Sequence, residues 1–343
     1  MHFDQVGTFA AAHGKLAWPW VAVNPARTAF AFATLDGQVA TRVWQENALV
    51  SGTSFTLPAD LRLPTRAAPP TGHRGVAQGI HGFAIDPAVG LLAVTGVVDG
   101  VSVLVTVDRE GEQRRSRLDA LAGGDFTAHA LTFDRSGERL WVSAESGSAT
   151  ALLLLDPRSH DVLGVVESAP FPPPAFHELH LHPQDDAVLL LAACGQDGTF
   201  ARVAGWSDGP PVSVSTALDS GASPAGFAGF SSDGTRVHLV EDAELRTHAW
   251  PDLTELSAAA LADDFTSSYV GVVVGDLILL DGHDADTETE DRVMIFDRSA
   301  LRGAVVPEPA PPGMWVGRLG ADLLITVDPK GDPAAGHVVR VRV

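Results

Sequence analysis

The sequence predicts an all-β protein, a single seven-bladed β-propeller whose blades each contain four antiparallel strands. Three observations lead to this prediction. The segments HGFAIDP from His81, HALTFDR from His129 and HELHLHP from His177 align without gaps, each starting 48 residues after the one before. Each copy continues as short β-rich runs separated by polar turns, and four strands in such a period form the unit of a propeller. Seven copies of this length account for the 343 residues.

The third copy shows the repeat most clearly. Its runs ALTFD, RLWVSA, ATALLLLD and DVLGVVES are separated by the polar segments RSGE, ESGS and PRSH. Alternating Val, Leu, Thr and Phe, broken by Ser-Gly and Asp-Pro, indicate strands and hairpins. We expect this blade at about 127–169, and the others at about 18–60, 80–122, 176–218, 225–262, 267–306 and 314–343. Residues 58–79 form the longest insertion between blades and are a candidate partner-binding or lid element.

The seventh copy ends after its third strand, HVVRVRV, so one strand of this blade is missing from the repeat. The segment HFDQVGTFA, within residues 2–11, alternates like a strand and belongs to no other blade. We therefore expect this N-terminal strand to complete the last blade. Such a closure removes both open sheet edges and holds the two termini in place.

The third copy, HALTFDRSGERLWVSAESGSATALLLLDPRSHDVLGVV, resembles the repeats of seven-bladed bacterial propellers of the YVTN and lactonase-like superfamily. Its turn Asp134-Arg135-Ser136-Gly137 stands where these repeats often carry Pro-Asp-Gly, and Ser231-Ser232-Asp233-Gly234 is closer to that pattern. The resemblance covers the whole chain but only at the level of the fold. Propellers of this kind include enzymes, ligand binders and scaffolds, so the fold does not select a function.

Composition and charge exclude several classes of protein. The formal net charge is −20, and no cluster of Lys and Arg with interleaved aromatic residues occurs, so a nucleic-acid partner is not expected. The longest apolar run, Ala187 to Cys194, is too short to cross a bilayer, and the first residues do not resemble a signal peptide. Cys194 is the single cysteine and is expected to be a buried, inert thiol. We expect a soluble cytoplasmic monomer without a membrane partner.

Three aligned histidines are the main candidates for chemistry. His81, His129 and His177 are each expected at the start of an innermost strand, on the face that we call upper. Consecutive blades are rotated by roughly 51 degrees, so the three imidazoles would lie along an arc and could share one divalent ion. Hydrogen bonding to a neighbouring blade is the preferred alternative, and acid–base catalysis is a third.

The segment FHELHLHPQDD contains two further histidines, but alternation along a strand separates them from His177. His177 points to one side of the strand, whereas His180 and His182 point to the other. His182 aligns with Asp86 and Asp134, so we expect it in a turn on the lower face. The segment also lacks the HExxH spacing of a helical zinc site.

Acidic and aromatic residues are expected around the upper face. The expected turns between second and third strands carry Asp36, Asp99, Glu145, Asp197, Glu241 with Asp242, Asp281, and Asp328 with Asp332. Together they predict a negative rim that attracts cations or a basic partner. The Pro-rich segments LPTRAAPPTGHRG, APFPPPAF and VPEPAPPGMW lie near Trp18, Trp20, Phe176 and Trp315, which suggests an aromatic pocket or simply a cover for the centre of the ring.

The turn DGHDADTETEDR, from Asp281 to Arg292, is the longest of these acidic turns. Its carboxylates Asp281, Asp284 and Asp286 form a candidate Ca²⁺ site, although the spacing of a calcium loop is absent. A solvated hairpin is the preferred interpretation.

Two functional hypotheses follow. The chain has no GxSxG elbow, no Gly-rich phosphate loop, no GxGxxG and no paired cysteines. The first hypothesis is therefore a non-enzymatic binding module that holds a protein partner or small ligand at its acidic, Pro-rich upper face. The alternative is a lactonase-like hydrolase or lyase that uses His81, His129 and His177. A divalent metal ion is the only candidate cofactor, and it belongs to this alternative.

Overall fold

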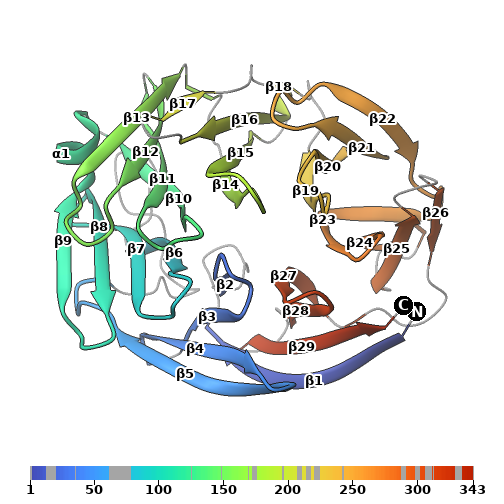
Figure 1. Ribbon diagram of the computed structural model, residues 1–343, viewed down its shortest axis with the longest axis horizontal. Helices are drawn as coiled ribbons and strands as arrows, with labels where there is room; N and C mark the ends of the chain where they lie inside the picture. Colours follow the sequence, from blue (N-terminus) through green and yellow to red (C-terminus); the bar gives the residue numbers. More distant parts are fainter. Residues whose placement is uncertain are drawn as a thin grey trace.

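The computed structural model describes residues 2–12, 21–34, 36–61, 79–124, 126–147, 149–168, 170–171, 176–194, 197–206, 211–213, 218–219, 225–241, 243–286, 291–297, 302–305, 311, 313–328 and 334–342. These residues form seven antiparallel sheets arranged in a ring, and one edge strand of each sheet lies nearest the central axis (Figure 1). The predicted seven-bladed β-propeller is confirmed.

The blades follow one another along the chain, and each is a simple meander. Blade 1 contains β2 (Val21–Val23), β3 (Ala29–Ala33), β4 (Gln38–Gln45) and β5 (Ala48–Thr56). Blade 2 contains β6 (Gly79–Ile85), β7 (Leu91–Val98), β8 (Val101–Asp108) and β9 (Gln113–Arg117), followed by the short helix α1 (Leu118–Ala122). Blade 3 contains β10 (Thr127–Phe133), β11 (Leu140–Glu145), β12 (Thr150–Leu155) and β13 (Val162–Ser168).

The second half of the ring repeats this order. Blade 4 contains β14 (Phe176–Leu181), β15 (Ala187–Ala193) and β16 (Thr199–Gly205), and its outer strand is divided into β17 (Val212–Ser213) and β18 (Leu218–Asp219). Blade 5 contains β19 (Ala225–Phe230), β20 (Arg236–Glu241), β21 (Glu244–Ala249) and β22 (Glu255–Ala260). Blade 6 contains β23 (Phe265–Val274), β24 (Leu277–Asp284), β25 (Asp291–Asp297) and β26 (Arg302–Val305).

Blade 7 closes the ring with strands from both ends of the chain. It contains β27 (Met314–Leu319), β28 (Leu323–Asp328) and β29 (Ala334–Arg342), and its outer strand is β1 (His2–Ala11). β1 runs antiparallel to β29, with His2 opposite Arg342 and Ala11 opposite Ala334. The two chain ends therefore lie side by side (Figure 1), which confirms the predicted closure.

The core lies between neighbouring blades, because the second strand of each blade is largely buried on both faces. All residues of β3 and β12 are buried. Trp141 of blade 3, for example, packs in one cluster with Leu152 of its own blade and Leu190 of blade 4. Side chains on both faces of each sheet thus bind it to its two neighbours, and the ring is stabilised by close packing.

The turns between the first and second strands of the blades form the lower face. In five blades, a polar side chain stabilises this turn. Backbone N–H groups of these turns donate hydrogen bonds to the side chains of Asn24, Asp86, Asp134, His182 and Ser231. These five side chains occupy corresponding positions in blades 1 to 5. Such local bonds satisfy backbone donors that the sheet leaves unpaired.

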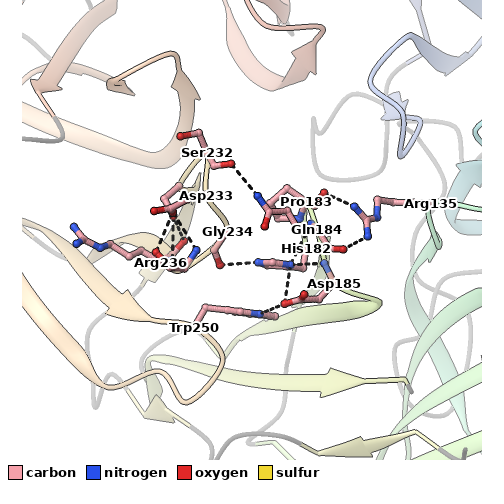
Figure 2. A network of polar contacts seen from close by, with 12 residues as sticks. Arg135, His182, Pro183, Gln184, Asp185, Ser232, Asp233, Gly234, Arg236 and Trp250 are labelled. Atoms are coloured by element: carbon pink, nitrogen blue, oxygen red, sulfur yellow. Dashed lines mark hydrogen bonds and ion pairs between the residues drawn. The ribbon is translucent and has the colours of Figure 1, made fainter. Parts of the chain in front are cut away.

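His182 shows how a lower-face turn also binds the next blade (Figure 2). Its Nδ1 accepts the N–H of Asp185 at 2.8 Å, so its Nε2 carries the proton and donates to the Gly234 carbonyl of blade 5 at 2.8 Å. The ring stacks on Trp250 at a centroid distance of 4.6 Å, and the Trp250 indole N–H donates to the Asp185 carboxylate at 3.1 Å. The predicted turn role of His182 is confirmed.

The structure corrects one predicted turn. β24 continues to Asp284 and β25 begins at Asp291, so Asp281 and Asp284 lie on a strand and not in the turn that the sequence suggested. No helix in the described part of the chain has the length and apolar character needed to cross a membrane.

Candidate functional site

His129, Glu145 and His177 form a cluster on the upper face, between blades 3 and 4. His129 comes from β10, Glu145 is the last residue of β11, and His177 is the second residue of β14. The His129 and His177 Nε2 atoms each lie 3.7 Å from Oε2 of Glu145. Among the described residues, these three form the one group whose metal-ligand atoms all lie within 4.8 Å of one another.

A β-bulge explains how His129 reaches this position. In β10, Ala128 pairs with Ala144 and Ala130 pairs with Ser143, so His129 is an extra residue without a partner in the ladder. A bulge re-aims the side chain of the extra residue. His81 occupies a corresponding bulge in β6, between Ile80 and Gly82.

β14 has no such bulge, and His177 therefore differs from the other two aligned histidines. It sits in a regular ladder opposite Ala192, and its side chain has an exposed fraction of 0%. Its ring lies against that of His129, with a centroid distance of 4.3 Å and an angle of 31° between the planes. Equal spacing in the sequence thus produces two different side-chain environments.

The two nitrogens of His177 are in unequal situations. Nδ1 forms a short hydrogen bond with the Ser143 hydroxyl, whereas Nε2 is buried and has no hydrogen-bond partner among the described residues. If Nδ1–H donates to Ser143, the Nε2 lone pair is directed at the space beside Glu145 and His129. Buried polar atoms are nearly always bonded, so an unbonded ring nitrogen facing two other ligand atoms indicates a missing partner.

Burial controls the protonation of all three groups. Burial, and secondarily His129, holds the pKa of His177 well below its usual range. Burial and the neighbouring His81 lower the pKa of His129 to about 4. Burial raises the pKa of Glu145, and a hydrogen bond from the Phe171 backbone opposes this rise. Both imidazoles are therefore neutral at neutral pH and have a lone pair to offer, and a cation would relieve the desolvation of Glu145.

The predicted arc of three histidines is only partly assembled. The structure brings His129 and His177 together, but His81 lies outside the group, and its Nδ1 is 3.3 Å from the Ala128 carbonyl. Glu145, which the sequence suggested only as part of an acidic rim, takes the third position. The pairing of β10 with β11 could have indicated Glu145. In this hairpin Thr127 pairs with Glu145, so the end of β11 lies beside the start of β10.

The other predicted binding residues are distributed differently. Phe176 is 55% exposed at the upper start of β14, and Asp36, Asp99 and Asp197 are exposed. Trp315 is 2% exposed and packs in the core with Val272 and Leu324, so of the two alternatives its side chain does not line a surface pocket. Trp18, Trp20 and most of the Pro-rich segments lie outside the described residues.

The candidate calcium ligands occupy unequal positions in blade 6. Asp281 and Asp284 are buried on β24, whereas Asp286 is exposed. Asp284 forms an ion pair with Arg292 and accepts the backbone N–H of Asp286. The carboxylate of Asp284 is therefore already paired with a positively charged group of the protein, the Arg292 guanidinium. Cys194 is buried, as predicted, and burial raises the pKa of its thiol to about 11, which leaves it protonated and unreactive.

No protein-family model matches the chain, and a search of curated proteins finds no significant relative. The structure shows the propeller, and membership of the YVTN and lactonase-like superfamily stays a prediction from the repeats.

Proposed function

We propose that this propeller is a metalloprotein that holds one divalent transition-metal ion with His129, His177 and Glu145 and uses it in a hydrolase or lyase reaction. The observation that carries the proposal is the buried Nε2 atom of His177, which has no hydrogen-bond partner in the described part of the chain and lies beside the other two ligand atoms. The proposal replaces His81 with Glu145 in the predicted metal-binding set.

The chemistry of the donors suits such an ion. Two neutral imidazoles and one carboxylate are the ligand set of several catalytic Zn²⁺ sites, and two histidines with one carboxylate also hold Fe²⁺. Three protein ligands leave coordination positions free for water or substrate. A bound ion of this kind supplies a Lewis acid that polarises a carbonyl group or activates water.

The surrounding residues would keep the ligands in position. Ser143 fixes the ring of His177 through Nδ1. Phe171 contributes a backbone N–H to Glu145, and its ring packs edge-to-face with that of His177 at a centroid distance of 5.6 Å. Partners of this type orient metal ligands and affect metal affinity strongly. The side chain of His129 is 26% exposed, so the site is open to solvent from the side of His129.

Elemental analysis of untagged protein tests the proposal. We expect about one equivalent of a transition metal after reconstitution and gel filtration, and loss of most of it in His177→Ala and Glu145→Gln. His81→Ala is the matched control, because this upper-face histidine lies outside the group and should keep its metal. Absence of metal from the folded wild type after reconstitution contradicts the proposal, as does equal loss in His81→Ala.

Activity is tested separately, because a metal site can be structural. Metal-loaded wild type should hydrolyse a lactone or ester, and Glu145→Gln should lose at least a hundredfold in kcat/KM. A metal-loaded protein that is inactive on a broad lactone, ester and lyase panel would restrict the conclusion to metal binding.

A second candidate function is the binding of a protein partner at the upper face. The exposed Phe176 favours it, because a large aromatic side chain on a surface that also carries the exposed Asp36, Asp99 and Asp197 can anchor a partner with basic residues. Cross-linking with a photoreactive residue at position 176 tests it. A single specific adduct that disappears at high salt supports this function, and absence of any adduct contradicts it.

A further inference from the structure

The outer strand of blade 3, β13, carries a concentration of exposed apolar side chains. Val162 is 40% exposed, Leu163 is 38% exposed and Val165 is 37% exposed. They are three of the six large apolar side chains that are exposed among the residues the structure describes. β13 lies on the outside of the ring (Figure 1), so these side chains are placed where another molecule can reach them.

β13 also has an open hydrogen-bonding edge. Among the described strands it pairs with β12 alone, from Val162 opposite Leu155 to Ser168 opposite Thr150. Alternate residues of an outer antiparallel strand direct their backbone N–H and C=O groups away from the neighbouring strand. Such an edge is a template for one more strand.

Other outer strands have features that discourage the addition of a strand. β9 contains three arginines in five residues, and β17 and β18 are two residues long each. Charged side chains and short strands are two ways in which proteins protect a sheet edge. β13 has seven residues, and the run from Val162 to Val166 contains no charged side chain. Its edge therefore lacks both kinds of protection.

Neighbouring blades hold β13 in place. His160, just before the strand, forms hydrogen bonds with Thr106 and Ser116 of blade 2. On the other side, a Cβ atom on Gly164 would overlap the ring of Pro211 in blade 4, so the two blades are in close contact there. A strand that is already fixed binds a partner without the cost of ordering its own backbone.

Charge distinguishes between two kinds of partner strand. Residues 156–168 carry three carboxylates and one arginine, in a protein whose net charge is −20. A second copy of β13, paired antiparallel about Gly164, would place Asp161 opposite Glu167 at each end, and like charges in opposite positions are destabilising. A strand with basic residues at its ends would meet the same carboxylates favourably.

We propose that the outer edge of β13 binds an extended segment of a protein partner as an additional strand, and that this segment has alternating apolar residues and Lys or Arg at its ends. Main-chain hydrogen bonds hold such a segment, and Val162, Leu163 and Val165 contact its apolar side chains. The surface is on the outside of the ring and is independent of the proposed metal site.

Selection from a display library of random peptides tests this surface. The library is selected on immobilised wild type and, in parallel, on the double variant Leu163→Ser/Val165→Ser. We expect wild type alone to enrich peptides with alternating apolar residues and terminal Lys or Arg. In fluorescence anisotropy, the most enriched peptide should bind the double variant at least tenfold more weakly than wild type, and added salt should weaken its binding to wild type.

Leu256→Ser is the matched control. Leu256 is 53% exposed on the outer strand of blade 5, at the bulge that corresponds to that of Leu163, and its replacement should leave peptide binding unchanged. All the substituted side chains are exposed, so thermal unfolding should show that the variants are folded.

Three outcomes would overturn the proposal. The first is the absence of enrichment that depends on β13, and the second is equal weakening in Leu256→Ser. The third is a wild-type dimer in analytical ultracentrifugation that the double variant does not form, because the edge would then hold a second copy of the chain.

Discussion

Two buried histidines at opposite ends of β14 differ in how completely they are bonded. His182, just after the strand, uses both ring nitrogens, one in its own turn and one on the Gly234 carbonyl of blade 5. His177, near the start of the strand, uses Nδ1 on Ser143 and leaves Nε2 unbonded. Burial alone therefore does not separate a structural histidine from a candidate ligand, whereas an unbonded ring nitrogen that lies beside two further ligand atoms, as in His177, does.

The surroundings of the two rings agree with this distinction. His182 stacks on Trp250 and belongs to a network that crosses from blade 4 to blade 5 (Figure 2). His177 faces a second imidazole and a carboxylate instead. The first arrangement stabilises the ring without further partners, and the second is completed only by a ligand. Four predictions test this comparison.

The largest expected effect is the loss of stability in His182→Ala. This substitution removes hydrogen bonds within and between blades and a stacked contact with Trp250, and we expect the free energy of unfolding to fall by about 3 kcal/mol. Urea unfolding of the metal-free protein measures it. His177→Ala should cost about half as much, because it also removes an unbonded buried nitrogen. Equal losses of unfolding free energy in His182→Ala and His177→Ala would contradict the proposed difference between the two histidines.

Metal should stabilise the upper site. At a metal concentration one hundred times Kd, the free energy of unfolding of wild type should rise by about 2.7 kcal/mol. The same urea titration with and without metal measures this rise. In Glu145→Gln, metal should raise the free energy of unfolding only slightly. His182→Ala should show the same rise as wild type, although its free energy of unfolding without metal is lower. A similar rise in Glu145→Gln would mean that the metal binds elsewhere.

A third buried histidine extends the comparison to pH. His160 has both nitrogens bonded, to Thr106 at 3.0 Å and to Ser116 at 2.9 Å. Burial lowers its pKa to about 4, with a smaller lowering from Arg114 that Asp156 opposes. Because the histidine of the unfolded chain, with its ordinary pKa of 6.5, binds more protons, the stability is present above pH 6.5 and is lost as pH falls toward 4.

The measurable quantity is the difference between wild type and His160→Gln. Between pH 7.5 and pH 5, wild type should lose about 2 kcal/mol more than the variant. Urea unfolding at several pH values measures this difference. Parallel pH profiles would show that His160 is not held neutral in the folded protein.

The smallest expected effect concerns the hydroxyl that orients His177. Ser143→Ala should weaken metal binding about tenfold, which corresponds to about 1.4 kcal/mol, because the ring loses its fixed tautomer and direction. Competition with a chromogenic chelator measures the affinity. Ser143→Thr keeps a hydroxyl and should restore part of it. An unchanged affinity in Ser143→Ala would show that Ser143 has no positioning role.

The sequence predicted features that depend on the repeat. The repeat predicted a seven-bladed propeller, and the leftover strand-like segment predicted closure by β1. The turn role of His182 also followed, because it aligns with Asp86 and Asp134. These features depend on residue type and spacing alone, which a single sequence displays.

The parts that were missed depend on pairing between strands. The bulges at His81 and His129 each shift the strand register by one residue, whereas β14 has no bulge at His177. No residue pattern in the sequence predicts this difference. Without the register, the hairpin partner Glu145 was not distinguishable from the other acidic residues. The burial of Trp315 was missed for a similar reason, because packing against Val272 of blade 6 is a contact between blades.

The pairing of β1 with β29 has a consequence for the time course of folding. During synthesis, β1 emerges from the ribosome long before its partner strand β29. Blades 1 to 6 can form their own meanders as they appear, because their strands are close in sequence, whereas the ring closes only through contacts between distant segments. β1 therefore remains without its partner strand until β29 has emerged, and during that time its backbone N–H and C=O groups are open to other strands.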